Sequence, residues 1–323
     1  MAHAAPLFSP VFFGTIVRSL LVMPLLRAST RTALAIAPAW VARTTARRFI
    51  TPPRIGHTPP ELELLKKARR LTTASPMGQL ATWQFGDSWR PAVIVSHGWG
   101  GRGAQFREFV PALMEAGYQV WMFDHVSHGM SEGREAPITD FARGLASVVR
   151  AAEASGARVS GLIGHSLGAA GIGIALRHEL GNPAAIRVVQ IAPPASLIRY
   201  SHQFARMLGL PEALRAGMQW RLERRIGKKW QEFELPGAVA PLQQKALVIH
   251  DENDKETRLD DGLQVAKSWP DARFKRTRGL GHNRILRDAE VIRAAIDFLA
   301  GSKEFPLPGE DEASSPPIPA PLY

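Results

Sequence analysis

The feature that most constrains the fold is a regular alternation of short apolar runs, rich in β-branched residues, with segments of helical hydrophobic spacing. Strands are expected at 78–86, 91–98, 118–124, 158–164, 186–192, 245–251 and, as an edge strand, 272–277. Helices are expected at 104–116, 138–155, 167–180 and 288–300, and a short helix or strand at 61–72. This order predicts an α/β fold with a doubly wound, mostly parallel sheet and helices on both faces.

One long segment, 195–240, interrupts the alternation because it lies between two expected strands and has helical spacing throughout. An excursion of this length is expected to form a helical lid over the C-terminal edge of the sheet. The segment carries a basic run, which we interpret as a solvated helix face, with contact to anionic lipid as the alternative. The run consists of Arg221, Arg224, Arg225, Lys228 and Lys229.

The formal net charge of +11 is concentrated at the N-terminus in chain order. Residues 1–70 contain 11 basic and 2 acidic side chains, whereas residues 71–323 contain 29 basic and 27 acidic ones. Since the region with the strand–helix pattern is close to neutral, its charge predicts no nucleic acid partner. The N-terminal excess instead raises the question of membrane association through residues 1–50.

The ends of the chain differ from its middle in composition. Residues 1–60 form an apolar, Arg-rich segment that ends in a Pro-rich linker at 51–60. Its stretch 7–26 is long enough to cross a bilayer, but Arg18 and two prolines oppose insertion. Helices lying on a membrane or on the domain, a spanning anchor and a cleaved targeting signal all remain open. The localisation stays open between cytoplasmic and membrane-associated, with cleavage of a targeting segment as a further option.

The domain organisation follows from these boundaries. We expect the α/β domain at 61–301, with its lid at 195–240, and a disordered, Pro-rich acidic tail at 302–323. Cysteine is absent from the chain. Disulfides, a thiolate nucleophile and Cys-based zinc or iron–sulfur sites are thereby excluded.

The strongest motif is Gly164-His165-Ser166-Leu167-Gly168, which fits G-x-S-x-G directly after an expected strand and before an expected helix. In such a turn the serine adopts strained backbone angles, and the residues two before and two after it must be small. The strain holds the hydroxyl clear of the sheet at a helix N-terminus, whose dipole favours negative charge. Ser166 is therefore the expected nucleophile.

A serine nucleophile needs a base and an orienting acid, which follow it in the chain for this motif. His282 is the only histidine after residue 250, and it follows the last expected strand. Three carboxylates follow the strand at 245–251, namely Asp251, Glu252 and Asp254. We favour Asp254, with Asp251 second because it is expected to lie at the strand tip. His125 and His128 are a weaker metal-ligand candidate and are interpreted as loop-forming residues.

A glycine-rich loop follows the strand expected at 91–98. Four of the six residues at 98–103 are glycine, so the backbone can turn close to the nucleophile. The expected oxyanion hole consists of the backbone amides of Trp99 and Leu167.

Together these motifs resemble the α/β-hydrolase superfamily over about residues 75–300. Residues 124–131 resemble its D-x-x-G-H-G-x-S loop, with Ser127 where glycine is usual. Residues 250–254 resemble its H-G-x-x-D pattern, with Asp251 in place of glycine, so the resemblance favours Asp254 as the acid. The resemblance implies a Ser-His-Asp hydrolase that acts on an ester or a similar acyl bond.

The expected function is therefore hydrolysis of a carboxylic ester, a lipid ester or another hydrophobic acyl ester among them, through an acyl-enzyme on Ser166. The same three residues would also serve a thioesterase, amidase, acyltransferase or C–C hydrolase. A non-catalytic ligand-binding module on the same fold is the alternative of another class. No cofactor and no metal are expected, the expected partner is a small-molecule acyl ester, and the oligomeric state stays open.

Overall fold

The computed structural model describes residues 36–302 and 305–308. The apolar stretch 7–26 and the part of the 302–323 tail from residue 309 lie outside the described residues, so the alternatives for the stretch stay open and the disorder expected for the tail stays a prediction. Among the helices within the described ranges, none is long and apolar enough to cross a membrane.

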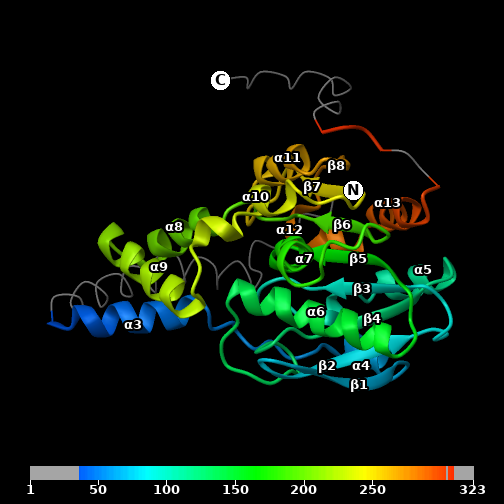
Figure 1. Cartoon of the computed structure of the whole chain (residues 1–323), viewed down its shortest axis with the longest axis horizontal. Helices are drawn as coiled ribbons and strands as arrows, with labels where there is room; N and C mark the ends of the chain where they lie inside the picture. Colours follow the sequence, from blue (N-terminus) through cyan, green and yellow to red (C-terminus); the bar gives the residue numbers. More distant parts are fainter. Residues whose placement is uncertain (1–35, 303–304, 309–323) are drawn as a thin grey trace, which may run out of the picture. The chain divides into compact units, whose positions relative to one another are not determined.

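The described residues form an eight-stranded sheet (Figure 1). Its strands are β1 (Arg69–Ser75), β2 (Gly78–Phe85), β3 (Ala92–Ser96), β4 (Gln119–Phe123), β5 (Val159–His165), β6 (Arg187–Ile191), β7 (Ala246–Asp251) and β8 (Ala272–Thr277). Their order in the sheet is β1-β2-β4-β3-β5-β6-β7-β8. The first two pairings, β1 with β2 and β2 with β4, are antiparallel, and the rest are parallel. The predicted doubly wound, mostly parallel α/β fold is confirmed.

Helices connect the strands. They are α4 (Pro59–Leu65), η2 (Gly103–Phe106), α5 (Phe109–Glu115), α6 (Ile138–Ala154), α7 (Leu167–His178), α10 (Leu235–Val239), α11 (Leu259–Ser268), α12 (Gly281–Arg284), η4 (Ile285–Arg287) and α13 (Ala289–Ala300). The segment 61–72, expected to be a helix or a strand, contains the end of α4 and the start of β1.

The core explains why the central strands are apolar on both faces. Val93 and Val95 of β3 belong to one cluster with Phe109 of α5 and Phe298 of α13. Ile94 lies between them and is also fully buried, so the opposite face of the strand is covered as well. The chain order around β3 reverses, since β4 lies on one side of it and β5 on the other. Ligands of open α/β sheets bind at such a reversal, outside the C-terminal strand ends.

A second compact unit combines residues 36–50 with residues 197–230. It contains α3 (Pro38–Phe49), α8 (Leu197–Leu208) and α9 (Glu212–Ile226). The Phe49 ring stacks on Trp230 at 5.4 Å between centroids and meets Phe204 edge-on at 5.1 Å. The segment 195–240, expected to be a lid, is therefore divided: 197–230 shares a core with the chain before residue 50, whereas α10 belongs to the α/β unit.

Residues 51–60 are not a free linker. The α/β unit begins at Thr51 rather than at the expected residue 61. The Arg54 guanidinium donates hydrogen bonds to the carbonyl oxygens of Gly129, at 3.1 Å, and Gly133, at 2.8 Å. Prolines stiffen a docked segment as well as a linker, so composition alone does not distinguish the two cases.

Candidate active site

Ser166 forms a sharp turn between β5 and α7. Its backbone has φ 53° and ψ −125°, a conformation that is strained for a residue with a side chain. The Ser166 N–H donates to the Ile191 carbonyl at 2.9 Å, and the Ser166 carbonyl accepts from the Ala169 N–H at 2.9 Å. These contacts hold the half-buried serine at the N-terminus of α7, as the motif predicts.

The glycines on either side of Ser166 are sterically required. A Cβ atom on Gly164 would lie 2.5 Å from the Cα atom of Ala169. A Cβ atom on Gly168 would lie 2.3 Å from the carbonyl oxygens of Ser96 and His97. Because backbone atoms cannot move aside as a flexible side chain would, the spacing of the G-x-S-x-G motif follows from how closely α7 packs against β3 and β5.

His282 lies on α12, after β8, and contacts the favoured acid. Its Nδ1 atom is 2.7 Å from Oδ2 of Asp254. The imidazole is largely buried and the carboxylate is fully buried. A carboxylate only accepts hydrogen bonds when ionised, so Nδ1 carries the proton and Nε2 is the basic nitrogen.

Asp254 is held in its ionised form. Burial would raise the pKa of this carboxyl, but hydrogen bonds from His282 and from the backbone N–H groups of Thr257 and Glu256 outweigh it and lower the pKa to about 2. The two N–H groups donate to Oδ1 at 3.0 and 2.8 Å. The negative charge that orients His282 is thus present across the neutral pH range.

The other two carboxylates after β7 have different surroundings. Asp251 is fully buried and accepts hydrogen bonds from the N–H groups of Leu280, at 3.0 Å, and Gly281, at 2.9 Å. Glu252 pairs with Arg278 at 2.8 Å. Asp251 therefore supports the loop that leads to His282, and the imidazole contact belongs to Asp254.

Two further side chains lie beside the contact between Asp254 and His282. Neither of them is among the predicted site residues. Thr257 donates its hydroxyl proton to Oδ2 of Asp254 at 2.9 Å. His165 has its Nε2 atom 2.8 Å from the His282 carbonyl oxygen. Burial, followed by the nearby His282, lowers the pKa of His165 to about 3, so this ring is neutral and donates from Nε2. A threonine three residues after an aspartate is typical of a turn closed by side-chain hydrogen bonds, which is the signal that points to Thr257.

His282 lies beside the residue that precedes Ser166 in the chain. The His282 ring lies 4.6 Å from the ring of His165, the residue before Ser166. Its Nε2 atom is 3.8 Å from the exposed carboxylate of Glu256. Within the described residues no hydrogen bond joins the Ser166 hydroxyl to His282, and such bonds are often long before substrate binds.

The glycine-rich loop after β3 passes next to the serine. A Cβ atom on Gly98 would lie 2.8 Å from Cβ of Ser166. The loop is fixed further along, where the Gly100 N–H donates to Nε2 of His128 at 3.1 Å. Leu167 is the first residue of α7, so its N–H has no acceptor within the helix. The expected oxyanion donors are the N–H groups of Trp99 and Leu167. Each of these residues directly follows a residue at the turn, Gly98 or Ser166.

Three buried histidines brace these loops. The His125 N–H donates to Nε2 of His97 at 2.9 Å, and Nε2 of His125 pairs with the Ser96 hydroxyl at 2.8 Å. Burial lowers the pKa of His97, His125 and His128, which keeps the rings neutral. Over residues 36–302 and 305–308, no group of three or more His, Cys, Asp or Glu side chains is arranged to hold a metal ion.

The loop at 124–131 shows why glycine is usual at one of its positions. Ser127 has φ 67°, in the left-handed region that favours glycine. Its hydroxyl donates to the Glu135 carbonyl at 2.8 Å. Asp124, fully buried, accepts from the N–H groups of Gly103, at 2.8 Å, and Met130, at 2.8 Å, and so ties two loops together.

This sheet, with a serine on a strained turn after β5 and a histidine after β8, defines a member of the α/β-hydrolase superfamily. The sequence model of one family within it, Hydrolase_4 (serine aminopeptidase, S33), matches residues 87–304. That match covers more than half of the chain, and the chain belongs to this family.

Curated relatives match a shorter stretch. The monoglyceride lipase of Homo sapiens is 27% identical over 135 residues, which is 38% of this chain and 45% of that protein. A monoglyceride lipase homolog of Monkeypox virus is 31% identical over 91 residues, 25% of this chain and 33% of that protein. The matched stretches thus span less than half the length of these relatives.

Solved structures extend the likeness over most of the fold. An esterase of Pyrococcus furiosus superposes with a TM-score of 0.61 at 19% identity, covering 77% of this chain and 98% of that one. Est1E of Butyrivibrio proteoclasticus, solved with ferulic acid bound, gives a TM-score of 0.58 at 16% identity, covering 72% of this chain and 98% of that one. At such low identities these likenesses show the fold alone.

Proposed function

We propose that this hydrolase cleaves carboxylic esters of hydrophobic acyl chains, with Ser166 as nucleophile, His282 as general base and Asp254 as the orienting acid. The observation that carries the proposal is the 2.7 Å contact between buried Asp254 and His282, beside a serine held on a strained turn. The monoglyceride lipases among the relatives support an ester of a fatty acid as the substrate class.

The reaction follows from the protonation states. The Ser166 hydroxyl oxygen attacks the ester carbonyl carbon while its proton passes to Nε2 of His282. The ionised Asp254 stabilises the imidazolium that results. The tetrahedral oxyanion accepts hydrogen bonds from the amides of Trp99 and Leu167, each worth about 2.7–4 kcal/mol of barrier in comparable sites.

The intermediate then collapses. The bond between the carbonyl carbon and the leaving alcohol oxygen breaks, and the alcohol takes the proton from His282. A water molecule, deprotonated by His282, attacks the acyl-enzyme and releases the carboxylic acid with Ser166 restored. No cofactor is required by these steps, because every proton moves between Ser166, His282 and the substrate or water.

The family description favours a second candidate of the same mechanism, since a serine aminopeptidase cleaves an amide bond. A panel of monoacylglycerols of graded chain length and aminoacyl p-nitroanilides separates the two. We expect kcat/KM to be highest for a monoacylglycerol. Preference for the anilides would replace the ester proposal with the aminopeptidase one.

The nucleophile is tested with a fluorophosphonate probe. We expect the probe to label wild type and to leave Ser166→Ala unlabelled, because the variant lacks the reactive hydroxyl. Ser160→Ala is the matched control, because Ser160 lies on the same strand β5 and its hydroxyl only donates to the Ala92 carbonyl at 3.3 Å. Equal labelling of wild type and Ser166→Ala would remove Ser166 from the mechanism.

A further inference from the structure

The positive charge of the protein is gathered in one structural unit. Residues 36–50 and 197–230, which form the helical unit, contain 11 basic and 2 acidic side chains. Residues 51–196 and 231–323 contain 26 basic and 27 acidic ones. The division is not visible in chain order. Residues 71–323 include the basic segment 197–230, yet they contain nearly equal numbers of basic and acidic side chains.

The two acidic residues of the helical unit each pair with one cation and leave most of its exposed cations without a carboxylate from this unit. Glu212 pairs with Arg215 at 2.7 Å, and Glu223 pairs with Lys229 at 3.0 Å. Within the described part of the chain, five exposed cations of this unit make no ion pair. They are Arg43 and Arg48 of α3, Arg221 and Arg224 of α9, and Lys228 directly after α9.

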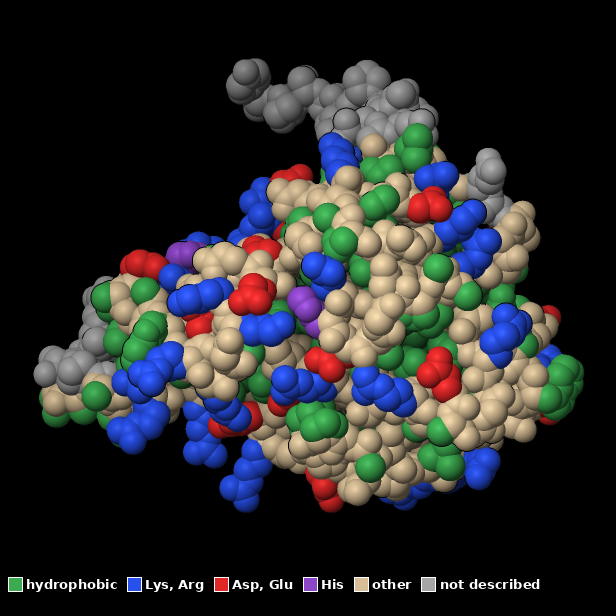
Figure 2. Space-filling view, viewed as in Figure 1, with side chains coloured by type: hydrophobic (Ala, Val, Ile, Leu, Met, Phe, Trp, Pro, Cys, Tyr) green, Lys and Arg blue, Asp and Glu red, His purple; other side chains and the backbone are tan. Residues whose placement is uncertain are grey.

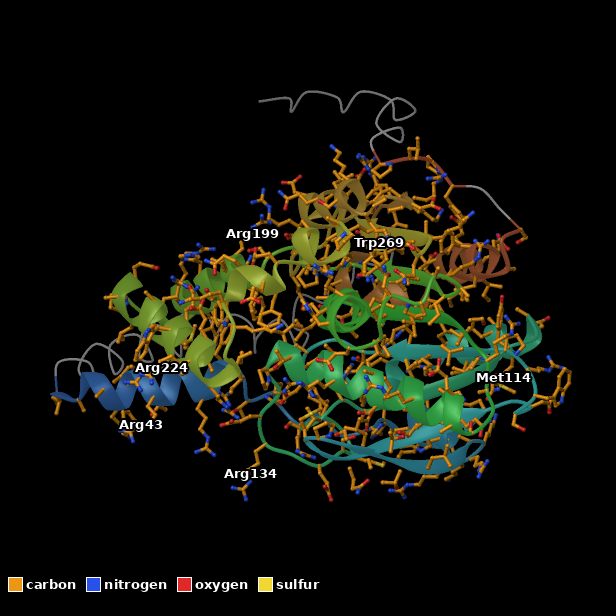
Figure 3. All side chains as sticks on the ribbon, in the orientation of Figure 1. Arg43, Met114, Arg134, Arg199, Arg224 and Trp269 are labelled. Atoms are coloured by element: carbon orange, nitrogen blue, oxygen red, sulfur yellow. The ribbon has the colours of Figure 1, made fainter. Side chains whose placement is uncertain are left out.

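Figure 2 shows Lys and Arg side chains gathered over α3 and α9, and Figure 3 labels Arg43 and Arg224 on these two helices. The helices share a core in which Ala46, Phe49, Met218 and Leu222 are buried. Because their inner faces pack against each other, the cations occupy the remaining, solvent-facing sides of the pair.

Large apolar side chains are exposed on the three helices of the same unit. Trp40 of α3 is 57% exposed, Trp220 of α9 is 51% exposed and Met207 of α8 is 50% exposed. The Arg224 guanidinium lies over the Trp220 ring at 5.0 Å. Arginine beside exposed tryptophan is the composition of helices that lie in the interface of a bilayer, where the ring enters the headgroup region and the cation meets phosphate.

We propose that this helical surface, formed by α3, α8 and α9, binds an anionic phospholipid membrane. Charge complementarity supplies the long-range attraction, and burial of Trp40, Trp220 and Met207 supplies the apolar contribution. A nucleic acid would also attract the arginines, but it offers no apolar layer in which to bury Met207. The proposal does not depend on ester hydrolysis, and it is tested without any substrate.

The test measures co-sedimentation of the full chain with vesicles of phosphatidylcholine alone and of phosphatidylcholine mixed with phosphatidylserine. Wild type is expected to bind the anionic vesicles more tightly and to be released as the salt concentration rises. The triple variant Arg221→Gln, Arg224→Gln, Lys228→Gln is expected to bind about 100-fold more weakly, since each cation near the surface contributes about 5-fold.

A matched charge control neutralises three cations of the α/β unit. Lys67→Gln, Arg69→Gln, Arg70→Gln removes the same charge from exposed positions and is expected to keep wild-type binding. Far-UV circular dichroism and Tm check that both triple variants are folded.

The tryptophans have their own control. Trp220→Ala is expected to weaken binding about 10-fold, because a Trp side chain contributes mainly through apolar burial. Trp89→Ala, in the α/β unit, is the matched change, since Trp89 is 79% exposed and its ring also carries an arginine, Arg90, at 5.2 Å. It is expected to bind as wild type does.

Three results would overturn the proposal. The first is equal binding of wild type and the Arg221, Arg224, Lys228 triple variant to anionic vesicles. The second is binding that does not distinguish anionic from neutral vesicles. The third is tight binding of single-stranded RNA without vesicle binding, which would assign the surface to nucleic acid.

Discussion

The carboxylate of Asp251 accepts a hydrogen bond from the backbone N–H of Gly281, the residue directly before His282, at 2.9 Å. Asp254 meets the same histidine from the side of its ring, at Nδ1. Two aspartates three residues apart thus support one histidine in different ways, one through the backbone and one through the imidazole. Their replacement is expected to have different consequences.

Asp254→Asn is expected to lower kcat on a soluble ester by about 10,000-fold with a small effect on KM, because the amide cannot hold the imidazole in the required tautomer. Asp251→Asn is expected to lower stability by about 1–3 kcal/mol, since buried N–H groups lose a charged acceptor, and to lower kcat less. Steady-state kinetics and urea unfolding of both variants check this. A larger kcat loss in Asp251→Asn would reverse the two assignments.

Acid is expected to destabilise wild type more than Asp254→Asn. The pKa of Asp254 is lowered to about 2 in the folded protein, against an ordinary value near 3.9 in an unfolded chain. A lowered pKa stabilises the fold above the unfolded value, and this stabilisation is lost as pH falls through the folded value. It amounts to about 2 kcal/mol, lost between about pH 4 and pH 2.

Urea unfolding of wild type and Asp254→Asn at several pH values between 6 and 2 measures this contribution. The difference in unfolding free energy between the two proteins should shrink by about 2 kcal/mol on acidification. A difference that stays constant with pH would show that Asp254 has an ordinary pKa.

Thr257 is expected to be a positioning residue, because its hydroxyl donates to the Asp254 oxygen that also meets His282. Thr257→Val removes that donor at nearly constant volume, and kcat is expected to fall about 10- to 100-fold, as loss of a hydrogen bond to a charged group allows. Thr257→Ser keeps the hydroxyl and should restore most of kcat.

A purely structural role of Thr257 would give a different pattern. Thr257→Val would then lower Tm without changing kcat below the unfolding transition. Measuring Tm and kcat on the same preparations separates the two cases.

Gly98→Ala is expected to lower kcat by about 100-fold, since its Cβ atom would lie 2.8 Å from Cβ of Ser166 and displace the serine or the loop. Gly237→Ala is the matched control: Gly237 lies in α10, and a Cβ atom there would meet nothing within 4 Å. This control should keep kcat and gain about 0.4–1 kcal/mol of stability. Full activity of Gly98→Ala would show that the loop does not approach the nucleophile.

The sequence was sufficient to predict the sheet and the contact partners Asp254 and His282, because the strands depend on local spacing and the two residues follow strand ends. The β-branched runs gave the strands, and the G-x-S-x-G spacing reflects contacts of Gly164 and Gly168 with neighbouring backbone. The contact of Asp254 with His282 was one of several open choices, since chain order alone leaves three carboxylates after β7.

Other features depend on long-range contacts that no local pattern encodes. Docking of residues 51–60 rests on Arg54 reaching carbonyl groups some 75 residues further on. The pairing of residues 36–50 with 197–230 likewise joins segments far apart in the chain, so the sequence predicted a lid and a separate N-terminal segment instead.

The stacking of Phe49 on Trp230 has a consequence for biosynthesis. Helix α3 leaves the ribosome well before α9, and at ordinary translation rates of about 5–20 residues per second the delay is about 10–30 s. During that interval the apolar face of α3 has no native partner, while strands β1 to β6 are already being made. The helical unit can therefore close only after α9 has been made, and until then the apolar face of α3 is available to a chaperone or a lipid surface.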